Sequence, residues 1–310
     1  MWLVVAAPAS AERLTLATWN VDLSRDGPGL LLRDIRAGKT DAVIAEIAAA
    51  APDVLVLTDI DFDHGGAALA ALDERLQAVG TGYPHRVARR PNAGWPTGRD
   101  LDGDGLLGGP RDAQGYGEFS GQGGMAVLSR RPVTLARDFS DLLWRDSPGT
   151  RQTEDDPARD LQRLSSSGHW MLEVETGGAP LTLLAWHATP PVFDGPEDRN
   201  GRRNADELAL WMAVLDGAFG PPPAWPVLIG DANLDPERGD GLGAAMREVL
   251  ADERLQDPLP GQATVTWPQT GPMRVSYILP AAGLPVAAAD VRDAISGEAH
   301  RLVTVSLDLP

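Results

Sequence analysis

The chain carries the stretch Val227-Leu228-Ile229-Gly230-Asp231-Ala232-Asn233, in which an apolar run ends on a glycine, a carboxylate and a carboxamide. The first three residues predict a short buried strand. Asp231 and Asn233 lie two positions apart, so on extended backbone both side chains point to one face of the sheet. An Asp there can ligate Mg²⁺ or polarise a water molecule, and an Asn can hold a phosphate without adding a repelling charge. An Asx turn that merely closes the strand explains the same pattern.

Four other strand-like runs also have polar side chains at one end. Taken one at a time, a lone histidine is compatible with a structural role, and an acidic strand end with a solvated cap. Active sites of layered α/β proteins commonly lie at strand ends, however, so five such ends in one chain predict a shared site. The residues at the other four ends are Asn20, Asp59 with Asp61, His187 and His300.

Strand-like and helical runs are interleaved along the chain, which predicts a layered α/β domain. The segment from Arg90 to Gly124 is rich in Gly, Asp and Pro and predicts a loop insertion rather than a linker between domains. Predicted strands begin near Leu14, Val54, Met125, Trp170, Leu181, Val227, Val275 and Leu302, and predicted helices span Asp41 to Ala50, Ala67 to Val79, Asn204 to Asp216 and Gly243 to Leu250.

The charge balance restricts the possible substrates. The chain has 27 basic and 44 acidic residues and a formal net charge of -17. Such a surface repels polyanions, and the sequence has no basic stripe of the kind that binds nucleic acid without sequence preference. If the substrate is a phosphate ester, metal ions must therefore supply much of the positive charge. The absence of cysteine excludes disulfides and thiolate metal ligands.

The N-terminus predicts export. Residues 1 to 7 are largely apolar, and Ala9-Ser10-Ala11 has the small-x-small form of a signal-peptidase site. We interpret residues 1 to 11 as the tail of a secretory signal, with a short apolar strand as the alternative, and residues 12 to 310 as one secreted or periplasmic domain. No run reaches the roughly 18 apolar residues that span a bilayer, and no obligate protein partner is evident.

The predicted insertion contains an acidic loop, Asp100-Leu101-Asp102-Gly103-Asp104-Gly105, that copies the opening of a calcium-binding loop. The twelfth position, where a bidentate Glu is expected, is Arg111, and Asp112 comes one residue late. A modified Ca²⁺ site and a plain solvated turn both explain this loop.

Two arginines precede a predicted helix. Arg202 and Asn204, the latter at a plausible N-cap, are candidate ligands of a substrate phosphate together with Arg203. A surface salt-bridge cluster with Asp206 and Glu207 explains the same residues equally well.

The order and spacing of these motifs resemble those of the endonuclease/exonuclease/phosphatase superfamily, which includes DNase I-like nucleases, sphingomyelinases and inositol-phosphate phosphatases. The resemblance implies a four-layer α/β sandwich, in which two mixed β-sheets pack face to face with helices outside. It is most similar to a bacterial subgroup. The motifs that carry it are Thr18-Trp19-Asn20, Asp53 to Leu57, Gly124 to Ser129, His187, Gly230-Asp231-x-Asn233, Ser276 to Pro280, His300, and the run from Thr189 to Glu207.

The resemblance also implies roles for individual residues. Asn20 and Asp59 would hold a catalytic Mg²⁺ or Mn²⁺, with Asp59 where the family usually has Glu and Asp61 as a further acidic ligand. Asp231 would orient and activate the attacking water, and Asn233 would bind the scissile phosphate. The two histidines, His187 and His300, would stabilise the developing charge or move protons.

Two positions depart from the family pattern. The family usually has Asp where this chain has Ser276 and Ala299, and those acids orient or charge-balance the imidazole of His300. Glu298 or Asp293 could substitute for them in space. We therefore expect a metal-dependent hydrolase of small-molecule, lipid-derived or nucleic-acid phosphoesters. The alternative is a weakened or inactive member that serves as an extracellular, calcium-stabilised binding scaffold.

Overall fold

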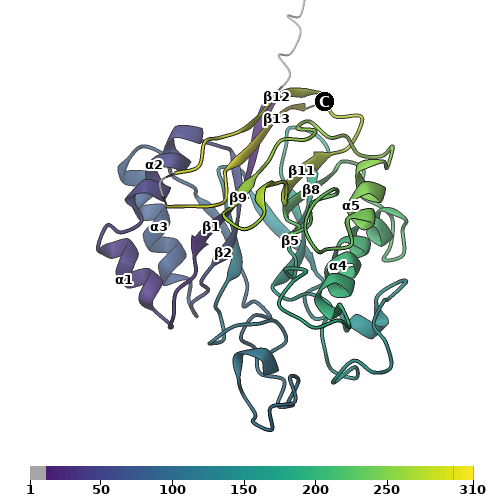
Figure 1. Cartoon of the computed structure of the whole chain (residues 1–310). Helices are drawn as coiled ribbons and strands as arrows, with labels where there is room; N and C mark the ends of the chain where they lie inside the picture. The colour runs from purple at the N-terminus through teal and green to yellow at the C-terminus, as the bar shows by residue number, and fades with distance from the viewer. Residues whose placement is uncertain (1–11, 296, 310) are drawn as a thin grey trace, which may run out of the picture.

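The computed structural model describes residues 12–295 and 297–309, so the predicted signal segment at 1–11 lies outside the described residues. Two large β-sheets dominate it (Figure 1). In spatial order, the six-stranded sheet contains β12 (Val286–Val291), β13 (Val303–Leu309), β1 (Glu12–Leu23), β2 (Val54–Ile60), β4 (Gly124–Ser129) and β3 (His85–Ala88). The five-stranded sheet contains β11 (Ser276–Pro280), β8 (Pro226–Asp231), β7 (Leu181–His187), β6 (Gly168–Val174) and β5 (Val133–Asp138).

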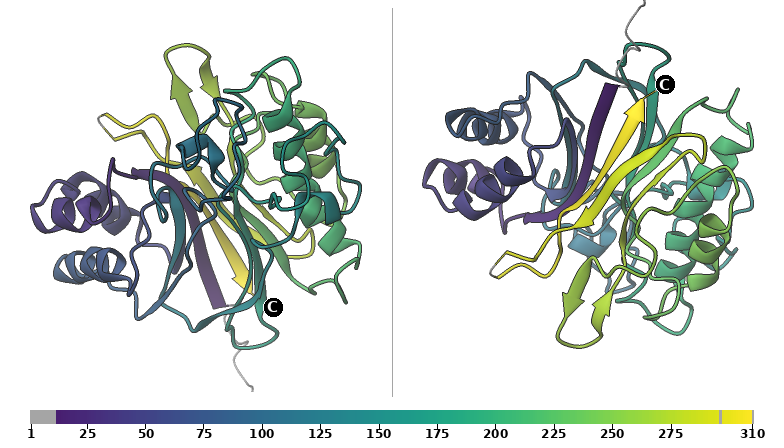
Figure 2. Two further views of the ribbon diagram at one scale, coloured as in Figure 1. Left: turned by 90° about the horizontal axis from the view of Figure 1, so that it is seen from below. Right: turned by 90° about the horizontal axis from the view of Figure 1, so that it is seen from above.

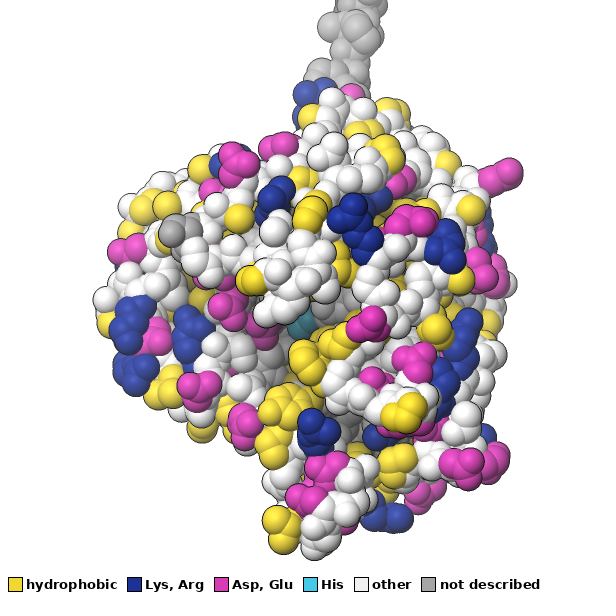
Figure 3. Space-filling model, viewed as in Figure 1, with side chains coloured by type: hydrophobic (Ala, Val, Ile, Leu, Met, Phe, Trp, Pro, Cys, Tyr) yellow, Lys and Arg dark blue, Asp and Glu magenta, His cyan; other side chains and the backbone are white. Residues whose placement is uncertain are grey.

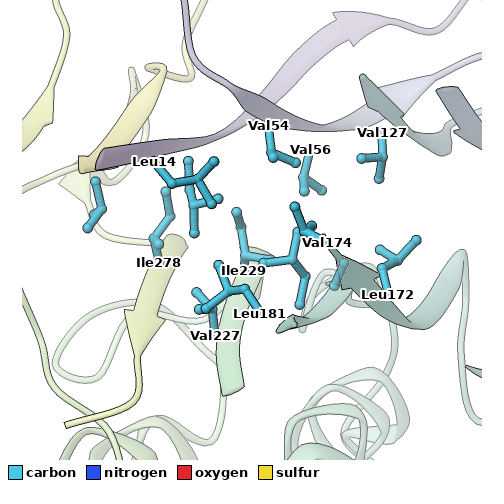
Figure 4. Packing of buried hydrophobic residues seen from close by; sticks show 14 of the residues in the cluster. Leu14, Val54, Val56, Val127, Leu172, Val174, Leu181, Val227, Ile229 and Ile278 are labelled. Atoms are coloured by element: carbon cyan, nitrogen blue, oxygen red, sulfur yellow. The ribbon is translucent and has the colours of Figure 1, made fainter. Parts of the chain in front are cut away.

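Both sheets are mixed. In the first, β1 and β2 run parallel, and in the second, β7 and β8 do so, while the other strand pairs are antiparallel. The two sheets pack face to face through branched aliphatic side chains (Figure 4), which include Leu14, Val56 and Ile229. Because side chains alternate between the faces of a strand, the intervening residues of β1 and β2 point outward toward the helices.

Helices cover the outer face of each sheet (Figure 2). Trp19 and Leu72 belong to the core beneath the first group of helices, and Trp186 and Trp211 to the core beneath the second. The predicted four-layer sandwich is therefore confirmed. The first group is α1 (Leu30–Arg36), α2 (Asp41–Ala50) and α3 (Ala67–Ala78), and the second is α4 (Arg199–Leu215) and α5 (Gly243–Leu250).

The predicted start of one helix is wrong. α4 begins at Arg199, after Asp198 with φ 50°, so Asn204 lies in its second turn and is not an N-cap. The error arose because the first turns of α4 bury polar side chains, which an apolar pattern cannot reveal. α1 and several edge strands were not predicted from the sequence. In β5, for example, every residue is exposed or half-buried.

The polar residues predicted from the sequence, among them Asn20, Asp59, His187 and Asp231, lie at the carboxyl ends of β1, β2, β7 and β8. A small hairpin of β9 (Val265–Trp267) and β10 (Gly271–Met273) adjoins them, because Val265 bridges to His300. The insertion hangs below the end of β2 in Figure 1 and contains a 3₁₀ turn at Pro110–Asp112. None of the helices within residues 12–295 and 297–309 is long and apolar enough to cross a bilayer.

Candidate active site

Asp231, the last residue of β8, is fully buried and links the two sheets. Its Oδ2 accepts a hydrogen bond from Asn20 Nδ2 of β1 at 2.7 Å, and its Oδ1 accepts the backbone N–H of Asn233 at 3.0 Å. These contacts fix the carboxylate in one orientation. The structure thus brings together two residues that are 211 positions apart in the sequence.

The backbone is strained at three of the strand ends. Asp22, Asp59 and Asn233 have φ of 49°, 56° and 49°, which L-residues rarely adopt. Gly230 has φ 149°, and a Cβ there would lie 2.0 Å from the carbonyl oxygen of Trp186, so only glycine fits. Strained backbone tends to cluster at functional sites, because only there does a protein gain from holding it. The strain therefore supports this edge as the site.

Carboxylates accumulate beside Asp231. Burial, and then the charges of Asp22, Asp61 and Asp231, raise the pKa of Asp59 to about 7. Burial also raises the pKa of Asp61 to about 6. The Asp61 carboxylate accepts the backbone N–H groups of Arg25 at 3.0 Å and Gly123 at 3.2 Å, so it holds two loops against the end of β2.

Asp22 is an acidic residue that the sequence analysis missed. It is exposed, and its charge acts on Asp59, Glu298 and His300. The signal was available, because Asp22 follows Asn20 by two positions, the same spacing that singled out Asp231 and Asn233.

His187 and His300 both lie close enough to Asp231 for its charge to act on them. His187 Nε2 is 4.0 Å from Asp231 Oδ2. Burial lowers the pKa of both imidazoles, and the Asp231 carboxylate opposes that shift in each. The edge of the His300 ring meets the Trp267 ring with centroids 5.5 Å apart and an interplanar angle of 83°. Figure 3 shows a histidine side chain (cyan) in a hollow of this face, with acidic side chains (magenta) beside it.

The two departures from the family pattern lie close to this site. Ser276 is buried directly opposite Asp231 in the β8–β11 register, and its Oγ has no hydrogen-bond partner. Ala299 packs against the small apolar cluster of β9 and β10. The carboxylates that act on His300 are Asp231 and Asp22, not Glu298 or Asp293.

The residues present fit a hard divalent cation. Asn20 gives its amide nitrogen to Asp231, which leaves its carbonyl oxygen for a ligand. The carboxylates of Asp22 and Asp59 add two further oxygen donors, and Mg²⁺ prefers oxygen. Burial and the charges of neighbouring carboxylates raise the pKa of Asp59, and a cation bound here would offset both. Asn20, Asp22 and Asp59 are therefore candidate metal ligands. The predicted ligand Asp61 lies beside them, and its carboxylate is engaged by the backbone N–H groups of Arg25 and Gly123.

Asn233 is half-buried, and its Nδ2 donates to the carbonyl of Ala188 at 2.8 Å. The arginines of α4 are engaged elsewhere. Arg202 forms a bidentate ion pair with Asp156, in which Nη1 and Nη2 each lie 2.8 Å from a carboxylate oxygen. Arg203 is buried and donates to four backbone carbonyls. The Asn204 amide group donates to two backbone carbonyls. Because their side chains are engaged in this way, neither Arg202 nor Asn204 is among the proposed substrate ligands.

The acidic loop brings three of its four predicted carboxylates together. Ligand oxygens of Asp100, Asp102 and Asp112 all lie within 4.8 Å of one another, in a group that could hold a metal ion. Asp104 is not part of this group and accepts the backbone N–H of Leu106 at 2.7 Å. The three grouped aspartates also accept backbone N–H groups of the same loop. The expected replacement of the twelfth-position ligand by Asp112 is thus compatible with the geometry.

A two-sheet α/β sandwich with acidic, amide and imidazole side chains at its strand ends defines the class of DNase I-like proteins. Residues 17–297 match the model of the endonuclease/exonuclease/phosphatase family, and the chain belongs to this family, whose members are hydrolytic phosphoesterases and nucleases. No curated protein matches the sequence.

Solved structures share the fold at low sequence identity. An endonuclease/exonuclease/phosphatase from Beutenbergia cavernae is 20% identical with a TM-score of 0.60, over 96% of this chain and 72% of that one. A family protein from Bacteroides thetaiotaomicron is 12% identical with a TM-score of 0.57, over 96% and 98%. A truncated TDP2 from Caenorhabditis elegans is 16% identical with a TM-score of 0.51, over 96% and 98%.

Proposed function

We propose that this protein hydrolyses a phosphoester with a divalent cation, Mg²⁺ or Mn²⁺, and a water molecule activated by Asp231. The observation that carries the proposal is the fixed, fully buried Asp231 carboxylate, hydrogen-bonded to Asn20 and flanked by His187. A positioned carboxylate of this kind can align a water and accept its proton.

The other side chains have complementary roles. Asn20, Asp22 and Asp59 hold the cation, which when bound supplies a Lewis acid for a phosphoryl oxygen. Asn233 uses one amide hydrogen on Ala188 and keeps the other for the phosphate. The lowered pKa of His187 and of His300 favours neutral imidazoles, each of which can donate one N–H to the developing negative charge.

The substrate is proposed from charge. A net charge of -17 repels long polyanions, so a small or lipid-derived phosphoester suits this protein better than duplex DNA. We also keep export to the periplasm or cell exterior as a proposal.

The second candidate is a calcium-stabilised binding scaffold of the same fold. It is favoured by the uncharged Ser276 and Ala299 near His300 and by the acidic group of the insertion. In this case Ca²⁺ would bind at Asp100, Asp102 and Asp112, and the chain would turn over no substrate.

Hydrolysis of bis-p-nitrophenyl phosphate and of a panel of mono- and diesters separates the two candidates. We expect turnover with Mg²⁺ or Mn²⁺, its loss in EDTA, and a fall in kcat of about 10³-fold in Asp231→Asn. Asp73→Asn is the matched control, because Asp73 is equally buried but lies in α3 and contacts Tyr83. No turnover across the panel, with a metal bound only near Asp102, would establish the scaffold instead.

A further inference from the structure

The buried face of α4 carries polar side chains that the proposed reaction does not use. Asn204 and Glu207 are 1% and 0% exposed. A buried amide and carboxylate cost free energy unless their hydrogen bonds are satisfied. Apolar residues at these positions would pack against the sheet without that cost, so their contacts indicate what the polar groups do.

Asn204 joins the two loops that carry the site residues. Its Nδ2 donates to the carbonyl of Thr189 at 2.7 Å and to the carbonyl of Ala232 at 2.7 Å. Thr189 follows His187 by two positions, and Ala232 lies between Asp231 and Asn233. One amide group therefore links the segments that follow β7 and β8, beyond the last paired residues His187 and Asp231.

Glu207 holds the same loop from the next turn of α4. Its Oε2 accepts the backbone N–H of Thr189 at 2.6 Å, and its Oε1 accepts the backbone N–H of Ser166 at 2.8 Å. The Ser167 hydroxyl in turn donates to the carbonyl of Gly123, whose N–H binds Asp61. The loop after His187 is thus connected to the acidic side of the site.

The two loops also bind each other directly. The N–H of Ala188 donates to the carbonyl of Asp231 at 2.9 Å, and Asn233 Nδ2 donates to the carbonyl of Ala188 at 2.8 Å. Asn204 adds two further hydrogen bonds to these loops from α4. α4 runs along the outer face of the five-stranded sheet (Figure 1), and Asn204 and Glu207 reach the loops from that face.

We propose that Asn204 and Glu207 are positioning residues, which fix the distance between His187 and the Asp231–Asn233 pair through Thr189 and Ala232. This proposal rests on the proposed function for its effect on rate, but not for its effect on geometry. A displacement of about 1 Å in a reacting group can cost about 100-fold in rate.

The test combines a spectroscopic and a kinetic measurement on Asn204→Ala and Glu207→Gln. The second variant keeps the side-chain shape and so guards against a failure of the first to fold. Asp206→Asn is the matched control, because Asp206 is an equally buried polar residue of α4 that binds Trp144 and Arg151, away from the site loops.

We expect the NMR signals of the His187 ring and of the Asn233 side-chain amide to move in both test variants and to stay in place in Asp206→Asn. We also expect kcat to fall about 10- to 100-fold, with KM and the Mg²⁺ half-saturation within about twofold of wild type. Unmoved signals in a folded test variant would overturn the proposal, and so would equal losses of kcat in the test variants and Asp206→Asn. If the wild-type protein hydrolyses nothing, the proposed function fails, while the NMR signals still decide the positioning role.

Discussion

The two histidine-bearing sides of the site are supported in different ways. His187 ends β7 inside a sheet, and the loop that follows it is tied to α4 through Thr189. His300 precedes β13 and bridges to Val265, and its carbonyl accepts Trp19 Nε1 at 3.3 Å. Its ring meets Trp267, and its neighbour Ala299 carries no charge. Neither Nδ1 atom has a hydrogen-bond partner. The difference is that buried polar side chains of α4 hold the loop after His187, whereas strand pairing and one ring contact hold His300.

Removing each imidazole tests this difference most strongly. We expect His187→Ala to lower kcat/KM by about 10²- to 10³-fold and His300→Ala by only about 10-fold, because the better-held group contributes more to the transition state. The rates are measured on the diester that the wild-type protein hydrolyses best. His64→Ala, at an exposed position in the loop before α3, is the control and should retain full activity. Equal losses at His187 and His300 would remove the distinction.

Adding a carboxylate near His300 should reduce the difference between the two histidines, because it gives the His300 ring a charged neighbour. Ser276→Asp places a negative charge in the strand next to Asp231, and we expect it to raise the pKa of His300. His300 would then become protonated at a higher pH, which an NMR titration of its ring measures. Ser276→Asn has the same shape without the charge and should leave the pKa where it is. The same shift in both variants would show that shape, not charge, is responsible.

The smallest expected effect concerns Asp59, one of the proposed metal ligands. The pKa of Asp59, about 7, lies above its unfolded value near 3.8. The folded state therefore binds this proton more tightly, so the stabilisation is present below about pH 4 and is lost as pH rises through about 7. In EDTA, we expect the Tm to fall between pH 5 and pH 8, and Mg²⁺ to restore part of it at pH 8.

Asp59→Asn should reduce this fall. Asp61 has a pKa shift of the same sign, so a weaker pH dependence should remain in the variant. A Tm of the metal-free protein that rises over the same interval would contradict the assignment of Asp59 to a buried acidic cluster.

Much of the fold could be predicted because the spacing of apolar residues differs between strands and helices. β7 and α2, for example, have the predicted bounds. Edge strands such as β5 could not be predicted, since they bury too little apolar surface. Polar residues at strand ends could also be predicted, because they directly follow an apolar run in the sequence. Whether Asn204 faces solvent or a backbone carbonyl depends instead on the tertiary packing of α4, which no local pattern contains.

The hydrogen bond between Asn20 and Asp231 means that the proposed active site is completed late in folding. It connects an early strand of one sheet to a late strand of the other. A nascent chain that ends before β8 holds half of the proposed machinery, and His300 arrives later still. Turnover would therefore report that the two sheets have docked, and every partly folded form would remain catalytically silent.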